Sequence, residues 1–349
     1  MKVAVNIFNN NSVNYADGIK IIINKGSIHA LEIYKEWMRK GATPFKHPSF
    51  KNCPQLLKSI VQTTDYSFPP IARTLEHEGL KKFWLEVEGG LIESVIIPMN
   101  FGYSLCVSSQ VGCKMGCTFC QTGKMGLIRN LKAEEIVQQL FIAKNVFGYT
   151  IRNIVFMGMG EPFDNFDEVK KAVSIMTDEN GLGIGPRHIT ISTSGRLDGI
   201  ERMKNELAPQ INLAVSVNAP NDQIRTKIMP INRKFSMDAL KASLQEFVRD
   251  SDRTIFAEYV LLAGVNDSLS HADELAEYLI DLPTLVNLIP YNPQHPDRFK
   301  RPDSETVNAF KERLKEKGLN ALVRTPKGTD VAAACGQLGK IRVLKKAEG

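Results

Sequence analysis

Three cysteines in one short segment are the residues of this sequence with the clearest capacity for chemistry. Cys113, Cys117 and Cys120 follow a C-x3-C-x2-C spacing, so eight residues contain all three thiols. Thiolates can close on one metal centre only where the backbone between them curls tightly, and Gly112 and Gly116 permit such a curl. The segment therefore predicts a loop that holds a soft metal centre.

The number of ligands indicates which kind of centre this is. A structural zinc site takes four Cys or His ligands, usually with a second pair further along the chain. No C-x2-C or H-x3-H pair follows the three cysteines. Three Cys with an open fourth position fit a [4Fe-4S] cluster whose remaining iron binds a substrate or cofactor. The alternative is a group of buried thiols, but six Cys in 349 residues make three so close together by chance a rare event.

The remaining cysteines and the composition indicate the compartment. Cys53, Cys106 and Cys335 are scattered, which is unlike the evenly spread set of a secreted disulfide framework. The composition, 43% hydrophobic and 23% charged, is typical of a globular protein. No apolar run is long enough to span a membrane, and no signal peptide opens the chain. We expect a cytoplasmic protein.

Seven short motifs carry a resemblance to a known family. The cysteine spacing, with Phe119 before the last thiol, resembles the cluster motif of radical S-adenosylmethionine (radical SAM) enzymes. The chain is similar in particular to the RlmN and Cfr family of RNA adenine methyltransferases, from about Glu93 to Gly339. The motifs occur in order as CVSSQVGC, GLIRNL, FMGMGEP, ISTSG, APNDQIR, LIPYNP and AACGQLG.

The resemblance implies two cofactors. Cys113, Cys117 and Cys120 would ligate three irons of a [4Fe-4S] cluster, and the fourth iron would chelate the amino and carboxylate groups of S-adenosylmethionine (SAM). One electron from the reduced cluster would then cleave SAM to a 5′-deoxyadenosyl radical, and two SAM molecules would be used per turnover. The residues expected to bind SAM are Gly160, Glu161, Ser192, Ser216, Val217, Asn218 and Asn292.

Two of these residues need separate comment, because Glu161 has an alternative interpretation and Asn218 departs from the family pattern. A carboxylate beside an ammonium gains a charge-assisted bond, so Glu161 suits the amine of the methionine moiety. The alternative is an acidic capping residue for the helix that follows. Where the family usually has His, this chain has Asn218, which offers a donor and an acceptor but does not titrate.

Two single cysteines match the catalytic cysteines of the family. The resemblance implies that Cys335 accepts a methyl group from one SAM by displacement. The radical made from a second SAM would take a hydrogen from that S-methyl group, and the resulting methylene radical would add to an adenine carbon. Cys106 would deprotonate the adduct and release it by forming a disulfide with Cys335. Taken singly, each would be read as a buried packing residue.

Glu93 and the RNA partner follow from the same resemblance. Glu93 matches a carboxylate that acts as proton acceptor in the family, although a charged residue in a strand is more often exposed to solvent.

A net charge of +6 favours a polyanionic partner only mildly. The cations that could meet RNA phosphates are Arg129, Arg225, Arg233, Arg298, Lys300, Arg301 and Arg324.

The hydrophobic pattern predicts a small helical part followed by strand-helix repeats. Helices are expected over 27–41, 55–62 and 70–77, and a hairpin over 82–98 around Gly89 and Gly90. Six strand-helix units then follow, and a last strand lies at 321–324. Their strands are expected at 105–108, 153–157, 188–193, 211–217, 255–262 and 285–290, and their helices at 132–147, 166–176, 197–204, 237–249, 272–280 and 304–317.

This pattern and the resemblance predict an α/β fold, a partial six-stranded (βα)6 radical SAM barrel with a small N-terminal helical domain. Parallel strands covered by helices place their active loops at the strand C-terminal ends. We expect a helical accessory domain at 1–80 that can bind RNA, a hairpin extension at 81–103, the barrel at 104–325 and a loop with Cys335 at 326–349.

The expected function is methylation of an adenine carbon of RNA. C2 of an adenine in the peptidyl-transferase centre of 23S rRNA is favoured, with tRNA as a further substrate, an electron donor such as flavodoxin and a monomeric enzyme. Methylation at C8, a different RNA target, a non-methylating radical SAM enzyme and a zinc-binding RNA module are the alternatives. The non-methylating enzyme would need neither Cys106 nor Cys335.

Overall fold

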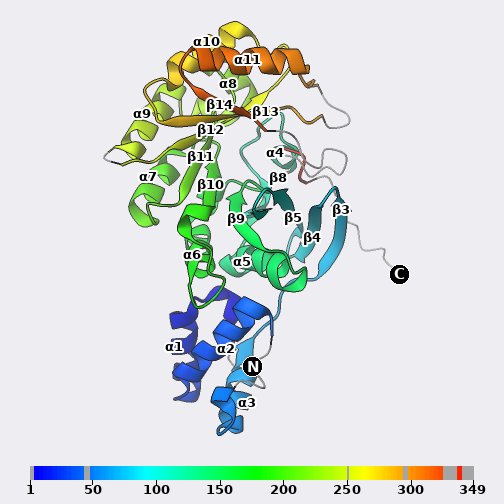
Figure 1. Ribbon diagram of the computed structural model, residues 1–349, viewed down its shortest axis with the longest axis vertical. Helices are drawn as coiled ribbons and strands as arrows, with labels where there is room; N and C mark the ends of the chain where they lie inside the picture. Colours follow the sequence, from blue (N-terminus) through cyan, green and yellow to red (C-terminus); the bar gives the residue numbers. More distant parts are fainter. Residues whose placement is uncertain (1–3, 43–47, 250, 294–297, 325–335, 340–349) are drawn as a thin grey trace.

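One mixed sheet forms the centre of the molecule. The computed structural model describes residues 4–42, 48–249, 251–293, 298–324 and 336–339 (Figure 1). Its ten-stranded sheet has the order β14-β13-β12-β11-β10-β9-β6-β5-β4-β3. The strands from β6 to β14 are parallel, and β3, β4 and β5 extend the sheet in antiparallel fashion. The sheet therefore joins a partial barrel to a hairpin extension.

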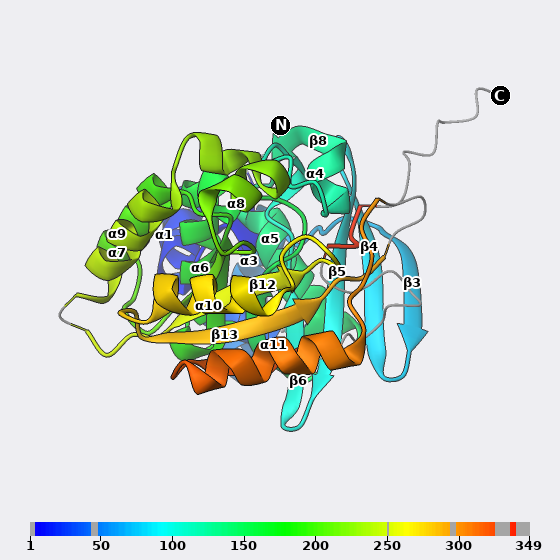
Figure 2. The same cartoon turned by 90° about the horizontal axis from the view of Figure 1, so that it is seen from above.

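The parallel part confirms the predicted strand-helix repeats and the radical SAM fold class. The strands are β6 (Gly102–Cys106), β9 (Ile151–Phe156), β10 (Ile189–Thr193), β11 (Asn212–Ser216), β12 (Ile255–Leu261), β13 (Thr284–Pro290) and β14 (Asn320–Val323). The helices after the first six are α5 (Ala133–Phe141), α6 (Phe166–Thr177), α7 (Leu197–Glu206), α9 (Met237–Val248), α10 (Leu269–Leu279) and α11 (Ser304–Glu316). They cover the outer side of the curved sheet (Figure 2). Burial on both faces explains the continuous apolar runs of these strands.

Shorter elements complete the barrel. α5 continues as a π-helical turn, η3 (Ile142–Val146). The cysteine loop contains β7 (Gln110–Cys113), α4 (Gln121–Met125) and β8 (Gly126–Asn130), and β7 pairs with β8. α8 (Asp222–Ile228) precedes α9. The single-turn helices are η4 (Pro162–Asn165), η5 (Pro186–His188) and η6 (Pro230–Arg233).

The hairpin extension differs from the prediction at one strand. β4 (Leu80–Val87) and β5 (Gly90–Met99) confirm the hairpin around Gly89 and Gly90. The helix predicted over 70–77 is wrong, because this segment is β3 (Ile71–His77), which pairs with β4. Glu78 and Gly79 both have positive φ, 49° and 77°, as a two-residue type I′ turn requires. The segment 71–80, expected in the helical part, therefore belongs to the main sheet.

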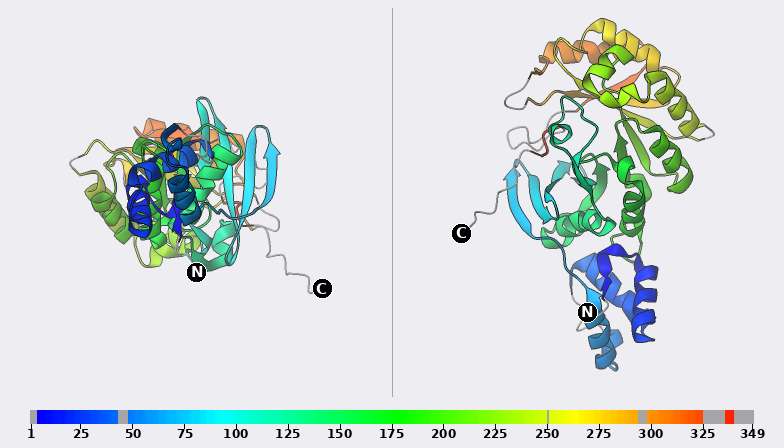
Figure 3. Two further views of the ribbon diagram at one scale, coloured as in Figure 1. Left: turned by 90° about the horizontal axis from the view of Figure 1, so that it is seen from below. Right: turned by 180° about the vertical axis from the view of Figure 1, so that it is seen from behind.

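The N-terminal part is a helical bundle at one end of the molecule (Figures 1 and 3). It contains β1 (Val5–Asn6), η1 (Ile7–Asn9), α1 (Ser12–Ile23), α2 (Ser27–Lys40), η2 (Pro48–Phe50), α3 (Pro54–Thr63) and β2 (Thr64–Asp65). The helices predicted over 27–41 and 55–62 are confirmed as α2 and α3. Phe8 packs edge-on against Phe141 of α5 and Trp37 stacks on it, with ring centroids 4.9 and 5.3 Å from that of Phe141. The bundle is thus packed on the helix that follows the cysteine loop.

Gln139 of α5 fixes the backbone directly after β6. Its Oε1 accepts hydrogen bonds from Ser94 Oγ and Ser108 N, both at 2.8 Å, and its Nε2 donates to Ser108 O at 2.9 Å. Gln139 and Ser108 are fully buried, so water cannot replace these bonds. One side chain thereby joins the hairpin extension, the first barrel strand and the first barrel helix.

We predict that Gln139→Leu destabilises the protein strongly. The substitution leaves Ser108 N–H and C=O buried without partners, which costs about 2–4 kcal/mol of unfolding free energy. Gln138→Leu is the matched control, since Gln138 Nε2 makes one bond, to Ser67 O at 2.9 Å, and its loss costs about 1 kcal/mol. Urea unfolding followed by circular dichroism measures both, and equal midpoints for the two variants would contradict the assignment.

Candidate active site

A cavity of about 160 Å³ lies at the C-terminal ends of the parallel strands. It has the cysteine loop on one side and the loops after β9, β10, β11 and β13 on the other. This is the edge at which barrel folds carry their active sites. The lining residues predicted from the sequence are Cys113, Cys117, Cys120, Gly160, Glu161, Ser192, Ser216 and Asn218. Eight residues scattered over more than a hundred positions therefore meet in one place.

The cysteine loop is held in its curl by backbone geometry. Gly112 has a φ of 77°, and a Cβ atom at this position would meet Gly126 O at 1.9 Å. Thr118 N donates to Ile228 O at 2.9 Å, which ties the loop to the end of α8. Burial raises the pKa of Cys113 to about 12 and that of Cys117 well above its ordinary value. Both would be thiols unless a cation offsets the cost of their ionisation.

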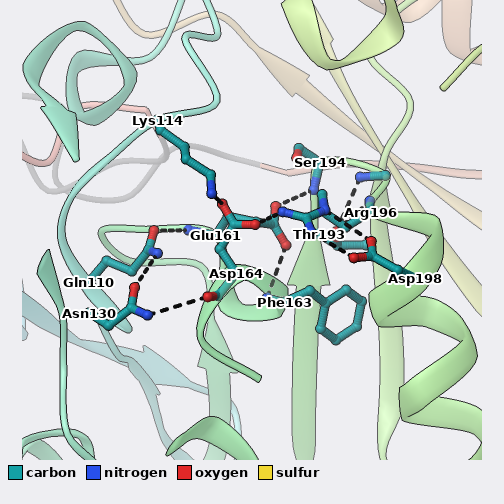
Figure 4. Close-up of polar contacts among 11 residues, drawn as sticks. Gln110, Lys114, Asn130, Glu161, Phe163, Asp164, Thr193, Ser194, Arg196 and Asp198 are labelled. Carbon is teal, nitrogen blue, oxygen red and sulfur yellow. Dashed lines mark hydrogen bonds and ion pairs between the residues drawn. The ribbon is translucent and has the colours of Figure 1, made fainter. Parts of the chain in front are cut away.

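Glu161 is a buried carboxylate at the centre of the polar contacts in Figure 4. Its Oε2 accepts from Ser194 N at 2.7 Å, and its Oε1 accepts from Phe163 N at 3.2 Å. Burial raises its pKa above that of an ordinary glutamate, against the opposing effect of these bonds. The second bond is the capping interaction for η4, and the side chain also lines the cavity, so both sequence interpretations describe part of its environment.

The glycines around Glu161 allow two strands to approach closely. A Cβ atom at Gly158 would meet Val107 O at 2.6 Å, and one at Gly160 would meet the Gln110 Cβ at 2.7 Å. Gly160 also has a φ of 109°, which an L side chain rarely adopts. The motif GMGEP is therefore required for the contact between the loop after β9 and the start of the cysteine loop.

The polar residues at the strand ends differ in whether they line the cavity and in whether their side chains are already hydrogen-bonded. Ser192 and Ser216 line the cavity. Asn218 also lines it, but its Oδ1 already accepts from Val260 N at 2.8 Å, and its φ of 57° fixes the backbone. Among the described residues, Val217 and Asn292 do not line the cavity. Val217 N donates to Glu258 O at 3.0 Å, and Asn292 Oδ1 accepts from Arg301 Nη1 at 3.2 Å.

Cys106 and Glu93 lie in the sheet next to this cavity. Cys106 ends β6 and is buried in a small apolar cluster with Leu80, Val95, Met159 and Leu338. Glu93 in β5 is buried too, and its Oε2 forms an ion pair with Lys82 Nζ at 2.6 Å. Cys335 lies outside the residues that the structure describes. Gly336, the next residue in the chain, lines the cavity.

The comparisons with known proteins agree on one family. The radical SAM superfamily model matches residues 107–279. The probable dual-specificity RNA methyltransferase RlmN 1 of Protochlamydia amoebophila is 47% identical over 98% of this chain and 96% of its own length. The dual-specificity RNA methyltransferase RlmN of Geobacter sulfurreducens is 39% identical over 93% and 91%. A crystal structure of a radical SAM methyltransferase from Sphaerobacter thermophilus superposes with a TM-score of 0.88 at 35% identity, covering 96% of this chain and 98% of that one.

The chain belongs to the RlmN family of radical SAM RNA methyltransferases. This confirms the resemblance drawn from the seven motifs. Within the part of the chain that the structure describes, no helix is long and apolar enough to cross a membrane.

Family membership implies a [4Fe-4S] cluster and SAM, and the residues present fit both groups. Three thiols and a buried carboxylate line one cavity. Over the described ranges, no three Cys, His, Asp or Glu side chains are arranged to hold a single metal ion. A cluster does not require that arrangement, because each cysteine binds a different iron. Ser194 lines the same cavity, and its backbone N–H donates to Glu161 at 2.7 Å.

Sequence reasoning missed Glu258, a second buried carboxylate that lines the cavity. It lies within β12, and its Oε1 accepts from Asn287 Nδ2 at 2.7 Å. Burial raises its pKa, with smaller opposing effects from Asn287 and Arg324. A charged residue inside the otherwise apolar strand Ile255–Leu261 was the available signal, because such a residue must face a polar cavity or a partner.

A second missed group surrounds Asp164, which forms ion pairs with Lys114 at 3.2 Å and with Arg196 (Figure 4). Arg196 also holds Asp198 through two hydrogen bonds, of 2.7 and 3.0 Å. Lys114 follows the first cluster cysteine directly. The group therefore links the cysteine loop to the loops after β9 and β10.

The predicted RNA-contacting cations have different environments. Arg225 is fully buried, so the expectation that it meets phosphate is wrong. Arg129 is half-buried and makes two hydrogen bonds to Glu135, of 2.6 and 2.8 Å. The exposed members of the set are Arg233, Arg298, Lys300, Arg301 and Arg324.

We predict that Glu258→Gln makes the protein more stable at neutral and alkaline pH. The pKa of Glu258 is raised in the folded state, so its contribution is favourable below the ordinary value of 4.5 and is lost as the pH rises through the folded pKa. Glutamine keeps an oxygen for Asn287 and does not ionise. Between pH 5 and pH 8, the melting temperature of the variant should therefore exceed that of the parent protein by a difference that grows with pH.

Glu246→Gln is the control for this series. Glu246 is exposed, and hydrogen bonds from Lys204 lower its pKa, so its removal cannot stabilise the protein as the pH rises. A Glu258→Gln variant whose melting temperature follows that of the parent protein at every pH would contradict the burial argument.

Proposed function

We propose that this protein methylates a carbon of an adenine base in RNA, most readily C2, through an S-methyl group on Cys335 and a disulfide between Cys335 and Cys106. The observation that carries the proposal is the docking of residues 336–339 against the cysteine loop. Gln121 N donates to Gly336 O at 2.9 Å, and Thr122 Oγ1 donates to Leu338 O at 2.8 Å. The chain that follows Cys335 is thus bonded to α4, the helix that begins directly after Cys120.

The same segment also reaches Cys106 and Glu93. Leu338 is a member of the apolar cluster that buries Cys106. Gly339 N donates to Glu93 Oε1 at 2.9 Å. The segment that follows Cys335 in the chain therefore contacts both Cys106 and Glu93, which supports the proposal that a carbon passes between the two cysteines.

The chemistry of each group indicates its role in the proposed reaction. The cluster and SAM, when bound, supply the deoxyadenosyl radical and the methyl group. Cys335 attacks a methyl group as a thiolate, which needs access to the cavity that Gly336 lines. Cys106 deprotonates the RNA adduct, and Glu93, held beside the cation of Lys82, is a further proton acceptor. Cys106 then attacks the Cys335 sulfur, and the product leaves as the disulfide forms.

The RNA must present an unstacked base. An adenine carbon inside a helix cannot reach a cavity at the barrel rim, so the base has to leave its stack. The two RlmN relatives are named as RNA methyltransferases of dual specificity. By that analogy we propose 23S rRNA and tRNA as the substrates, held by the exposed cations around 298–301 and 324.

The proposal is tested with anaerobically reconstituted enzyme, a low-potential one-electron donor, methyl-deuterated SAM, and rRNA or tRNA fragments. Mass spectrometry should find deuterated methyl on Cys335 and then 2-methyladenine in the RNA. Cys335→Ala should abolish both signals, whereas Cys106→Ala should trap RNA covalently on Cys335. A methyl group found on C8 of the adenine would show that C8 is the position methylated. An enzyme that cleaves SAM but leaves Cys335 without a methyl group would be a non-methylating radical SAM enzyme.

We predict that Lys82→Met lowers RNA methylation far more than SAM binding. The substitution leaves the Glu93 carboxylate buried without its cation, a change that costs about 3–5 kcal/mol for a buried pair and should displace the 336–339 segment. A fall in rate of about tenfold or more is expected, since each 1.4 kcal/mol lost from the transition state is worth that factor.

Lys81→Met is the matched control for Lys82. Lys81 precedes it in β4, pairs with Glu76, which is mostly exposed, and is only partly buried itself. Its substitution should leave methylation near the parent rate. Equal losses in the two variants would show that Lys82 contributes only to the stability of the hairpin.

A further inference from the structure

Arg225 is a fully buried arginine whose guanidinium donates to uncharged acceptors. It lies in α8, and its guanidinium donates to Val217 O at 3.1 Å, Ser194 O at 2.7 Å and Ser216 O at 2.9 Å. A fourth bond runs to Asn232 Oδ1 at 2.9 Å. All four acceptors are uncharged, and among the described residues no carboxylate forms an ion pair with this guanidinium. A full positive charge is thus held away from water.

Burying such a charge is expensive unless an anion lies nearby. An unpaired buried ion costs several kcal/mol even after the protein relaxes around it. Burial lowers the pKa of Arg225, and negative charge on Tyr278, on a Cys117 thiolate or on Asp222 would raise it. The fold therefore places the cation where a negative charge at the cysteine loop would offset its cost.

The helix that carries Arg225 packs directly on the cysteine loop. Thr118 N donates to Ile228 O at 2.9 Å, and a Cβ atom at Gly116 would lie 3.7 Å from Pro230. Ile228 also belongs to the apolar cluster against which Cys117 and Cys120 pack. Arg225 does not line the cavity itself, and its guanidinium lies behind Ser194 and Ser216, which do.

We propose that Arg225 is the counter-charge of the metal centre and raises its reduction potential. The inference rests on the proposed ligation of a [4Fe-4S] cluster by Cys113, Cys117 and Cys120. An oxidised core of charge +2 with three thiolates has a net charge of −1. One electron from a low-potential one-electron donor makes it −2. A fixed buried cation stabilises the second state more than the first, and net charge is one of the factors that set cluster potentials.

A purely structural role is the competing explanation. The four hydrogen bonds hold together the loops after β10 and β11, which carry Ser194 and Ser216 of the cavity wall. Loss of these bonds would destabilise the protein whatever the charge of the replacement. Charge and hydrogen bonding are therefore varied separately.

The test compares Arg225→Lys, Arg225→Gln and Arg225→Met in anaerobically reconstituted enzyme. Lysine keeps the charge and loses the planar fork, whereas glutamine loses the charge and keeps some hydrogen bonding. The readout is the midpoint potential of the cluster, measured by redox titration followed by electron paramagnetic resonance. Melting temperature and iron content are recorded for each variant.

We expect the midpoint potential of each variant to depend on whether residue 225 is charged. The potential should stay near the parent value in Arg225→Lys and shift to more negative values in both Arg225→Gln and Arg225→Met, although all three lose thermal stability. Potentials that are unchanged in the neutral variants, or that change equally in Arg225→Lys, would overturn the inference. A parent protein that binds no four-iron cluster would instead remove the proposed function.

A fourth variant keeps the test open if the neutral ones do not fold. Asp222 is exposed, and its Oδ1 accepts from Asn232 Nδ2 at 2.6 Å. Asn232 also accepts from the guanidinium of Arg225, so it lies between the two charged groups. Asp222→Asn keeps an acceptor and removes a negative charge that acts on Arg225. The potential should then shift in the opposite direction, to less negative values, and a shift to more negative values would contradict the proposal.

Discussion

The cysteine loop depends on backbone hydrogen bonds from segments that are distant in sequence. Thr118 is bound by the end of α8, 110 residues later, through Ile228 O, and Gln121 donates to Gly336 O near the end of the chain. Such a loop could not hold three thiols in place alone, since its own regular structure consists of the short pair β7 and β8 and the five-residue helix α4. Every other feature of the site, including the position of the C-terminal segment, follows from how this loop is fastened.

Much of the fold was predictable because helices and strands leave periodic traces. The six strand-helix units and α2 have boundaries within a few residues of those expected, as buried parallel strands and amphipathic helices dictate. The strand at 71–77 was not predictable in this way. It is half-exposed throughout, and its type I′ turn uses Glu78 and Gly79 in place of the commoner Asn-Gly.

The site was predictable only where a residue type or motif carries its own signal. Closely spaced cysteines, and glycines beside an acid, marked the cysteine loop and Glu161. Glu258 and Lys82 lie outside the seven motifs, and APNDQIR, which ends at Arg225, does not reveal that this residue is buried. The role of each is defined by what surrounds it in three dimensions. Arg225 shows the difficulty most clearly, since an arginine in a loop-rich segment suggests a solvated charge, and here it is fully buried.

Buried charges of both signs surround the cavity, and their arrangement suits a reaction that must exclude water. Glu161 and Glu258 line it, Arg225 lies behind Ser194 and Ser216 of its wall, and Lys82 and Glu93 form a buried ion pair in the hairpin extension. In a medium of low dielectric these charges act on one another strongly, so each is tolerable only with its partners. Glu93 has a neighbouring cation among the described residues, whereas Arg225 is bonded to uncharged acceptors. If the metal centre balances the charge of Arg225, as proposed above, assembly of the cofactor would also stabilise the wall of the cavity, because binding of the cofactor and folding of the wall would then be coupled.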